Sequence, residues 1–306
     1  MRKIMTVIIA FIAVFSCKPM DRLNPTDKEA SNFIGWTFEG SIGYFTELSD
    51  FVIATDPSDS RDYIFAIDSA TEEIHKFMMD GTPTLTIANG TPKMLVNPSG
   101  ICSMQGICFI VDRDPSYDLD AFQIDNPLNN KWWYDIAGGE KIETYNNMLY
   151  TAQKDPPAVY VYAYTPPTSY SSAGQWTITK GDASCDTCMA AVSDITASTT
   201  PGEFMLTDPV LMRISIFDSS GNHTGRNINV GMPVVSAAGY GDRVYVPTTD
   251  GIRIYNYSSG EFLRTIANYG VGNGRVGAPG RIRLYAGKNI LVGSGTHIKF
   301  FSTQGL

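Results

Sequence analysis

The sequence is short of histidine, of positive charge and of long hydrophobic runs. Only three histidines occur among 306 residues, and they are scattered at His75, His223 and His297, a distribution that argues against a metal site built on several imidazoles. The formal net charge of −8 argues against a basic surface of the kind that binds nucleic acid. No apolar stretch reaches the roughly 20 residues that a transmembrane helix needs.

The first 17 residues have the order of an export signal. Arg2 and Lys3 precede an uncharged, mostly apolar run at residues 4–15, and the small residue Ser16 precedes Cys17. This order is typical of a secretory signal. A cysteine directly after the small residue resembles the lipobox of a bacterial lipoprotein, in which that cysteine carries the lipid. The alternative is an ordinary cleaved signal with an incidental cysteine.

The predicted organisation is a signal peptide at residues 1–16, lipidated Cys17 with a flexible tether at 17–31, and a folded domain at 32–306. Attached lipid chains tether a protein to a membrane without spanning it. In enteric-type sorting, an aspartate directly after the lipidated cysteine indicates retention in the inner membrane. This chain has Lys18 at that position, so the outer membrane is favoured. The protein would lie on the periplasmic face of that membrane or at the cell surface. Loss of Arg2 and Lys3 with the signal leaves 21 Lys+Arg against 31 Asp+Glu, a net charge of −10.

The rest of the chain repeats one all-β unit six times. Each repeat has a short strand that carries an apolar residue a few positions before a glycine, and these residues recur every 38 to 50 positions: Phe38, Ile87, Ile136, Ile178, Ile228 and Ile266. All four tryptophans fall in these segments. A period near 45 residues with alternating apolar and polar positions is typical of the four-stranded blades of a β-propeller.

The two ends of the repeat complement each other. In the fifth unit three further strands are predicted at residues 233–238, 243–246 and 252–257, whereas the sixth unit stops after three strands. A surplus strand lies at the start of the domain, at residues 33–39. We therefore predict an all-β, six-bladed propeller, closed by the N-terminal strand that completes the last blade and removes its exposed edge.

Two stretches carry a more specific pattern. Residues 272–282, together with 290–300, resemble an NHL repeat, and residues 97–101 with 108–112 resemble it as well. NHL-type propellers include protein-binding and RNA-binding modules, a peptide lyase and lactonase-like relatives. The resemblance implies the propeller fold and leaves the function open.

Four cysteines remain after Cys17. Cys102 and Cys108 flank residues 104–106, which are predicted to form a three-residue hairpin loop that places the two cysteines opposite each other. Cys185 and Cys188 form a CxxC in the loop before the fourth blade. In an exported protein this set favours two local disulfides. A redox CxxC and a zinc site are the alternatives for the second pair.

Acidic and aromatic clusters supply the candidate binding residues. Carboxylates at alternating positions loosely resemble a calcium loop, although the central Gly and the terminal Glu of an EF-hand are missing; they are Asp112, Asp114, Asp118 and Asp120. Calcium is therefore the one cofactor that the sequence suggests. The alternative is that these residues form an ordinary solvent-exposed acidic loop. In the third blade, Tyr160, Tyr162 and Tyr164 alternate with small apolar residues. They indicate either a packed strand or an aromatic surface for a protein or glycan ligand.

The sequence identifies no catalytic residue, because neither a Gly-x-Ser-x-Gly elbow nor a Ser-His-Asp order is present. We therefore predict a lipid-anchored envelope propeller that acts as a non-catalytic binding or scaffold module. Its expected partners are a protein or glycan ligand at one propeller face and the membrane, to which the N-terminal lipid attaches the chain. Nucleic acid is not expected to bind. The alternative is an envelope hydrolase or lyase, lactonase-like or glycan-cleaving. It requires acids such as Asp112 and Asp208 to converge on a metal in the central channel.

Overall fold

The computed structural model describes residues 35–43, 45–87, 95–113, 119–128, 131–134, 136, 139–165, 169–267, 275–285 and 289–304. The segment Ile34–Leu306 forms one compact unit. Over these described ranges the chain consists of strands and their connections. None of the residues in them belongs to a helix that could cross a membrane.

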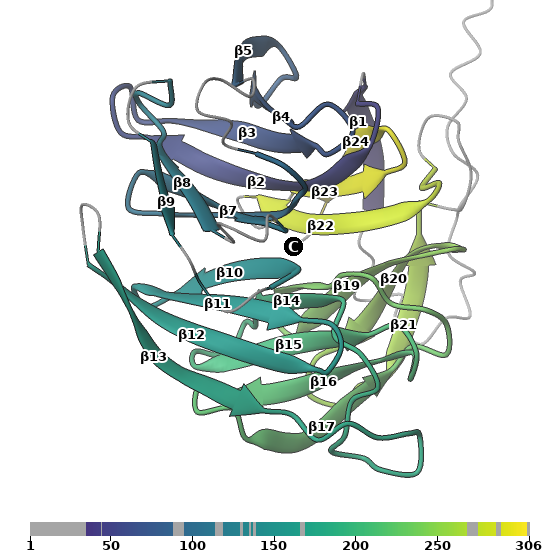
Figure 1. Cartoon of the computed structure of the whole chain (residues 1–306). Helices are drawn as coiled ribbons and strands as arrows, with labels where there is room; N and C mark the ends of the chain where they lie inside the picture. Colours follow the sequence, from purple (N-terminus) through teal and green to yellow (C-terminus); the bar gives the residue numbers. More distant parts are fainter. Residues whose placement is uncertain are drawn as a thin grey trace, which may run out of the picture. The chain divides into compact units, whose positions relative to one another are not determined.

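Six antiparallel sheets of four strands each follow one another along the chain. Blade 1 consists of β2 (Leu48–Asp56), β3 (Arg61–Asp68), β4 (Glu73–Met78) and β5 (Pro83–Ile87). Blade 2 consists of β6 (Pro98–Met104), β7 (Ile107–Asp112), β8 (Leu119–Gln123) and β9 (Lys131–Tyr134). Blade 3 consists of β10 (Lys141–Tyr145), β11 (Met148–Gln153), β12 (Ala158–Thr165) and β13 (Ser169–Thr177). Blades 4 and 5 consist of β14 (Asp194–Ala197), β15 (Glu203–Asp208), β16 (Arg213–Asp218) and β17 (His223–Asn229); and β18 (Ala238–Tyr240), β19 (Arg243–Thr248), β20 (Gly251–Asn256) and β21 (Phe262–Ile266). Blade 6 consists of β22 (Pro279–Tyr285), β23 (Asn289–Ser294), β24 (His297–Gln304) and β1 (Gly35–Ile42). Figure 1 shows first strands such as β22, β2 and β10 facing the middle of the ring, with β5, β13 and β17 at its outside. The chain is a six-bladed β-propeller, as the repeat predicted.

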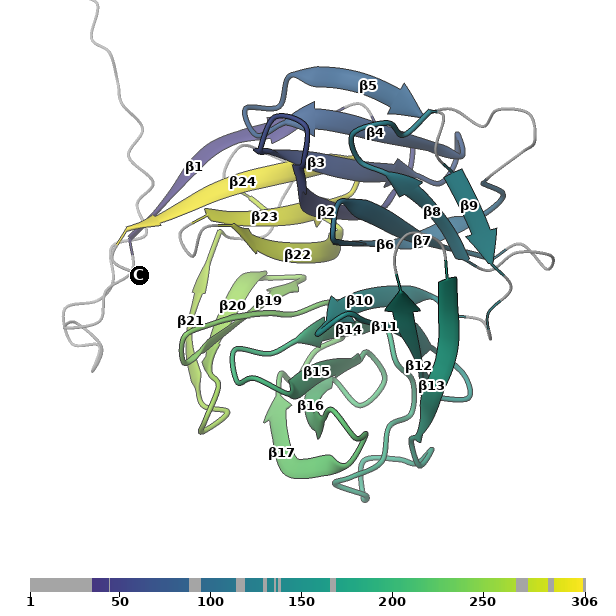
Figure 2. The same ribbon diagram turned by 90° about the vertical axis from the view of Figure 1, so that its left-hand side faces the viewer.

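The ring is closed by the N-terminal strand. β1 runs antiparallel to β24, from Gly35 opposite Gln304 to Ile42 opposite Ile298, and Figure 2 shows the purple β1 beside the yellow β24. Phe38 packs edge-on against the ring of Phe301, with centroids 5.7 Å apart. The predicted closure is therefore confirmed. Its strand extends to Ile42 rather than 39, and residues 33 and 34 lie outside the described ranges.

Apolar side chains fill the space between each pair of neighbouring blades. The buried residues divide into six clusters, and each cluster joins strands of two adjacent blades, including one between blades 6 and 1. We call these clusters the seams. Because successive side chains of a strand point to opposite faces of the sheet, every blade contributes to two seams. The repeated isoleucines that marked the period are all buried: Ile87, Ile136, Ile178, Ile228 and Ile266.

Acids at the ends of second strands hold the loops that lead into the blades. The carboxylate of Asp68 accepts the backbone N–H groups of Thr46 (2.6 Å) and Glu47 (2.9 Å). Asp112 does the same for Val96 (2.6 Å) and Asn97 (2.7 Å). Buried backbone N–H groups must find acceptors, so a carboxylate at this point fixes the start of the first strand.

The first strand of blade 5 differs from its prediction. Residues 233–238 were expected to pair, but β18 covers only Ala238–Tyr240. Pro233 has no N–H to donate to a ladder. Ser236 is buried and its hydroxyl donates to Asp194 of blade 4 at 2.6 Å. This segment therefore bonds across to another blade before it enters its own sheet.

The predicted disulfide between Cys102 and Cys108 is wrong, because the hairpin is one residue shorter than expected. Cys102 lies opposite Phe109, and Ser103 lies opposite Cys108, so the turn has two residues, Gln105 (φ 52°) and Gly106 (φ 78°). A shift of one residue moves a side chain to the other face of the sheet. Cys102 therefore lies in the seam with blade 3 and Cys108 in the seam with blade 1. Both are free, buried thiols, and burial raises the pKa of each.

Candidate functional site

Four residues occupy equivalent places at the inner edge of their blades. Each of them pairs with the second-to-last residue of the second strand of its blade. The pairs are Asp50 with Ile67, Gly100 with Val111, Lys141 with Ala152, and Asp194 with Thr207. The first strands surround the middle of the ring (Figure 1). The repeat therefore places two carboxylates and an ammonium group at the same level of the central channel.

Gly100 explains how Lys141 crosses blade 2 to reach blade 1. A Cβ atom at Gly100 would lie 3.0 Å from the Cα of Lys141, so a side chain there would push the two blades apart. Lys141 donates its ammonium protons to the carbonyl oxygens of Ser49 (3.1 Å) and Ser99. Its Nζ lies 3.7 Å from the carboxylate of Asp50.

Arg281 of β22 connects four blades at the centre of the ring. Its side chain is only 2% exposed, and its guanidinium pairs with Asp194 and lies 3.7 Å from Asp50 and 3.3 Å from Glu143. These carboxylates belong to blades 4, 1 and 3. The ion pairs therefore join residues that are up to 231 positions apart in the sequence (50 to 281).

A second level of charge lies two residues further along two of these strands. Glu143 follows Lys141, and Arg283 follows Arg281. The guanidinium of Arg283 lies 3.1 Å from Glu143 Oε2, the oxygen that Arg281 also approaches. Alternate residues of a strand share a face, so both levels project from the same side of β10 and of β22. We call the two levels the central network: Asp50, Lys141, Glu143, Asp194, Arg281 and Arg283.

The central network keeps Asp50 ionised. Burial acts to raise the pKa of Asp50, but the nearby positive charges, Lys141 first among them, outweigh burial and hold the pKa below its usual value. Burial lowers the pKa of Lys141. Burial, and then the positive charge of Arg283, lower the pKa of Arg281 to about 10. The network combines three acidic residues, Asp50, Glu143 and Asp194, with three basic ones, Lys141, Arg281 and Arg283.

A small cavity lies at each end of the network. One, of about 160 Å³, is lined by Ser49, Asp50, Gly280 and Arg281, where the first strands begin. The other, of about 230 Å³, is lined by Ser103, Glu143, Thr144 and Arg283, towards the ends of the first strands. Each cavity therefore adjoins two residues of the central network: Asp50 and Arg281 line the first, and Glu143 and Arg283 line the second.

The acids proposed for a channel metal perform a different task. The carboxylates of Asp112 and Asp208 bond backbone N–H groups at the start of their blades, the latter to Ala190 at 2.7 Å. Asp120 is buried within blade 2, and Asp114 and Asp118 lie outside the described residues. Where the structure describes the chain, no three His, Cys, Asp or Glu side chains are grouped as metal ligands. Asp112 and Asp208 thus have a structural role.

The tyrosines of blade 3 belong to the interior. Tyr162 and Tyr164 are buried in the seam with blade 2, where Tyr164 packs edge-on against Phe109 with centroids 5.0 Å apart. Tyr160 is half-buried and donates its hydroxyl proton to Gln153 at 2.9 Å. The three tyrosines therefore belong to a packed strand, which was one of the two predicted alternatives. The other alternative, an aromatic binding surface, is wrong for Tyr162 and Tyr164, because both are buried.

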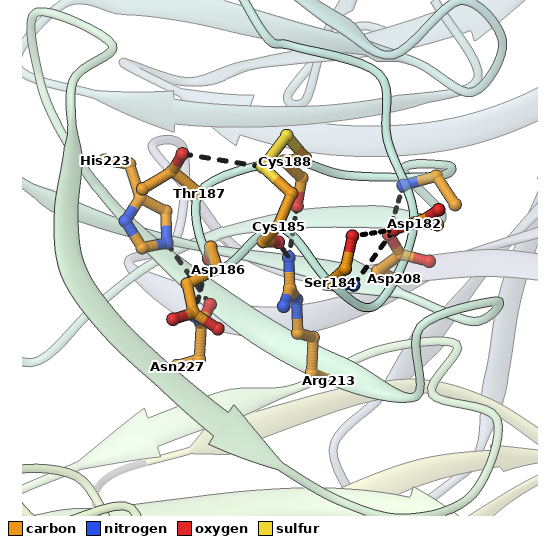
Figure 3. The surroundings of a disulfide bond; sticks show 11 residues. Asp182, Ser184, Cys185, Asp186, Thr187, Cys188, Asp208, Arg213, His223 and Asn227 are labelled. Carbon is orange, nitrogen blue, oxygen red and sulfur yellow. Dashed lines mark hydrogen bonds between the residues drawn. A yellow bond between two sulfur atoms is a disulfide. The ribbon is translucent and has the colours of Figure 1, made fainter.

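The second cysteine pair forms the predicted disulfide. Cys185 and Cys188 are bonded in the loop between β13 and β14 (Figure 3). Their carbonyl oxygens accept from the guanidinium of Arg213, a buried residue at the start of β16, with Cys185 at 2.9 Å. A Cβ atom at Gly181 would lie 2.7 Å from Cys188 Cβ, so glycine is required beneath the bridge. The loop is thereby fixed to blade 4.

An apolar turn lies beside this loop. Residues 209–212 join β15 to β16, and Val210 and Met212 are 59% and 41% exposed. Asp208 accepts the N–H groups of Val210 and Leu211 at 2.9 Å each, and the carbonyl of Met212, whose φ is +54°, accepts the N–H of Val230 at 2.9 Å. A bulky residue in this conformation is uncommon. The turn is therefore held firmly while it presents apolar side chains to solvent.

Sequence reasoning identified the disulfide but missed the central network. Its acids and bases occur singly in short strands, where each looks like an ordinary surface residue. One signal was present: Asp50, Lys141, Asp194 and Arg281 all lie at or near the start of the first strand of their repeats. Aligning the repeats on the ends of their second strands would have placed Asp50, Lys141 and Asp194 at one level of the channel.

No protein-family model matches this sequence, and no curated protein matches it. Among solved structures, the chain is similar to one in the crystal structure of a nidogen/laminin complex. The two share 14% sequence identity with a TM-score of 0.50, over 71% of this chain and 78% of that chain. The likeness is one of fold. At this identity it does not transfer a site.

Proposed function

We propose that this chain is an exported, lipid-anchored propeller of the cell envelope that binds a protein partner through blade 4. The surface concerned consists of the turn Val210, Leu211 and Met212 with the disulfide loop at residues 181–188; we call it the blade 4 face. The observation that carries the proposal is a firmly held turn with exposed apolar side chains. Side chains of this kind, rimmed by polar groups, are typical of interaction sites.

The charges around the turn indicate the chemistry of the partner. Asp182 and Asp186 are exposed on the neighbouring loop, and the chain as a whole is acidic. A complementary partner is therefore a protein surface with an apolar centre and Lys or Arg at its rim. The resemblance to NHL repeats, a group that includes protein-binding modules, supports the same assignment.

Two features support placement outside the cytoplasm. Disulfides persist in oxidising compartments, and Cys185–Cys188 is such a bond. The leader order ending in Ser16 and Cys17 supplies the export signal and the lipid site. Cys17 lies outside the described residues, so lipidation is tested directly: Cys17→Ala should release the protein from the membrane fraction and abolish fatty-acid labelling. Labelling that persists would disprove the anchor.

Partner binding is tested with the full chain isolated from its own membranes. Val210→Asp should remove a specific co-purifying protein, because a charge replaces the apolar centre of the blade 4 face. Leu128→Asp is the matched control, since Leu128 is similarly exposed (55%) but lies on blade 2. A partner that the wild type and the control retain and Val210→Asp loses supports the proposal. Identical partners in all three would refute it.

A further inference from the structure

A third cavity lies beside β1, the strand that closes the ring. It measures about 160 Å³, which is space for about five water molecules. Blade 6 and the turn after β4 of blade 1 form its walls. Five of the lining residues are partly or fully exposed, so a ligand in the cavity can reach them: Glu39, Met79, Tyr285, Asn289 and Phe300. We call it the closure cavity.

A bulge in the closing strand leaves one aromatic ring of this cavity uncovered. Phe38 pairs with Phe301 and Gly40 with Phe300, so Glu39 is the extra residue of the bulge. Cross-strand partners lie on the same face of a sheet, but Gly40 has no side chain to lay over Phe300. Among the described residues, no atom beyond its chain neighbours lies within 4 Å of the place where a Cβ atom of Gly40 would stand. The ring of Phe300 is therefore open to a ligand from the side of β1.

Carboxylates lie next to the aromatic walls of the closure cavity. Of the described residues that line it, only Glu39 carries a charge. The carboxylate of Glu39 accepts the hydroxyl proton of Ser302, which is two residues from Phe300 and thus on the same face of β24. Tyr285 donates its hydroxyl proton to Asp62 of blade 1 at 2.8 Å. Both aromatic residues therefore have a carboxylate beside them.

The neighbouring positive charge is directed elsewhere. Arg283 shares a cross-strand row with Leu291 and Phe300, but its guanidinium contacts Glu143 of the central network at 3.1 Å, and Arg283 is not among the residues that line the closure cavity. Aromatic rings attract cations, and so do carboxylates. The cavity therefore favours a ligand with a positive head and an apolar body.

We propose that the closure cavity binds a primary ammonium group on a short unbranched alkyl chain. The ammonium group donates to the carboxylate of Glu39, and the chain packs against Met79 and the ring of Phe300. An ammonium group is a compact charge with three donors, and about four carbons with one nitrogen match the volume of about five water molecules. The same chemistry occurs in a free alkylamine and in a lysine side chain. This site goes beyond the protein-binding function proposed for the blade 4 face.

The probes are n-butylammonium and 1-butanol, which differ in charge, added to the full chain and followed by ligand-observed NMR. A ligand of this size binds with a Kd of about 1–10 mM when its contacts are well formed. We expect butylammonium to bind about three- to fivefold more tightly than butanol, and the difference to shrink in about 0.5 M salt. Nα-acetyl-lysine N-methylamide identifies the source. Binding at least as tight as that of butylammonium assigns a lysine side chain of a protein, and weaker binding assigns a free amine.

Three variants complete the test. Glu39→Gln removes the charge but keeps the shape, and should weaken butylammonium about three- to fivefold while leaving butanol unchanged. Gly40→Leu covers Phe300 and should remove binding of both probes. The backbone at Gly40 has no left-handed φ and a side chain there has room, so the unfolding midpoint should stay that of the wild type. Glu261→Gln is the matched control, because Glu261 is an exposed acid on blade 5, and it should bind as the wild type does.

Two results would overturn the proposal. Equal binding of butylammonium and butanol, or none of butylammonium at about 50 mM, would refute the ammonium site. An affinity for butylammonium that Glu39→Gln leaves unchanged would refute it as well. Either result would leave the blade 4 face unaffected, since that surface lies on another blade.

Discussion

Two regions of the ring meet at the first strand of each blade: the apolar seams on its two faces and the charged network at its inner edge. The seams are formed by many interchangeable aliphatic and aromatic contacts, and loss of one methyl group there costs little. The network is formed by six charged side chains in which Arg281 serves carboxylates from three other blades. Loss of one partner leaves buried charge behind.

The comparison shows how stability and specificity are divided. Seam contacts are non-directional and would also serve a ring with a different number of blades. Ion pairs require a fixed geometry and join non-adjacent blades, so we infer that the network selects the six-bladed closure. A buried ion pair adds little net stability compared with apolar residues of similar volume, but breaking one is strongly destabilising.

The largest expected effect comes from opening a seam. Deletion of residues 18–42 removes β1 and exposes the edge of β24, together with the buried Ile298 and Phe301. The lost burial of Ile42 and Phe38 should lower the free energy of unfolding by at least about 3–5 kcal/mol, and the free edge should promote aggregation. Denaturant unfolding and light scattering measure both effects.

Its control is deletion of residues 18–30, which leaves every described strand intact. This shorter truncation should match the full chain in its unfolding midpoint. If the two truncations are equally stable, β1 does not close the ring.

The second effect tests the centre. Arg281→Met leaves the buried carboxylate of Asp194 without the guanidinium that pairs with it and removes one of the two cations beside Asp50, so it should cost about 3–5 kcal/mol. Arg253→Met is the matched control: its partner Asp250 has a side chain 42% exposed, so its loss should cost about 1 kcal/mol or less. Ile290→Val trims a seam and should cost about 0.5–1.5 kcal/mol. A loss at Arg281 no larger than that at Arg253 would contradict the network's role.

The two regions also differ in how far the sequence revealed them. The seams follow from alternating apolar residues and the 38-to-50-residue period, which are local signals, and so the blades and their closure could be predicted. The network depends on contacts between residues such as Asp50 and Arg281, which only the closed ring brings together. No local pattern distinguishes these charges from solvent-exposed ones.

The hairpin at Cys102 and Cys108 shows a smaller limit of the same kind. Composition correctly indicated a tight turn with Gly106, but two-residue and three-residue turns differ by one position, and this difference reverses which face each cysteine occupies. The pair Cys185 and Cys188 was easier to predict. It lies in a loop outside any ladder, where strand register does not separate the two side chains.

Acid should weaken the centre before the seams. The pKa of Asp50 is lower in the folded chain than its ordinary value of 3.8, so Asp50 contributes stability that is present above pH 3.8 and lost as pH falls through the folded value. Asp50→Asn should therefore be less stable than the wild type at pH 7, and the difference should narrow below pH 3.8. Unfolding curves from pH 7 to pH 3 measure it. A constant difference would show that the charge of Asp50 is not the cause.

The smallest expected effect concerns the disulfide, which lies outside both regions. A bridge between residues three positions apart removes little chain entropy, so Cys185→Ser with Cys188→Ser should cost about 2 kcal/mol or less, below the loss expected at Arg281. Part of this cost arises because Arg213 bonds the carbonyls of the bridged turn, which the open loop would hold less firmly. Thiol mapping of denatured, unreduced Cys17→Ala protein should find Cys102 and Cys108 free and the other pair bonded. A bond between Cys102 and Cys108 would require a different register in blade 2, and would place both cysteines in one seam.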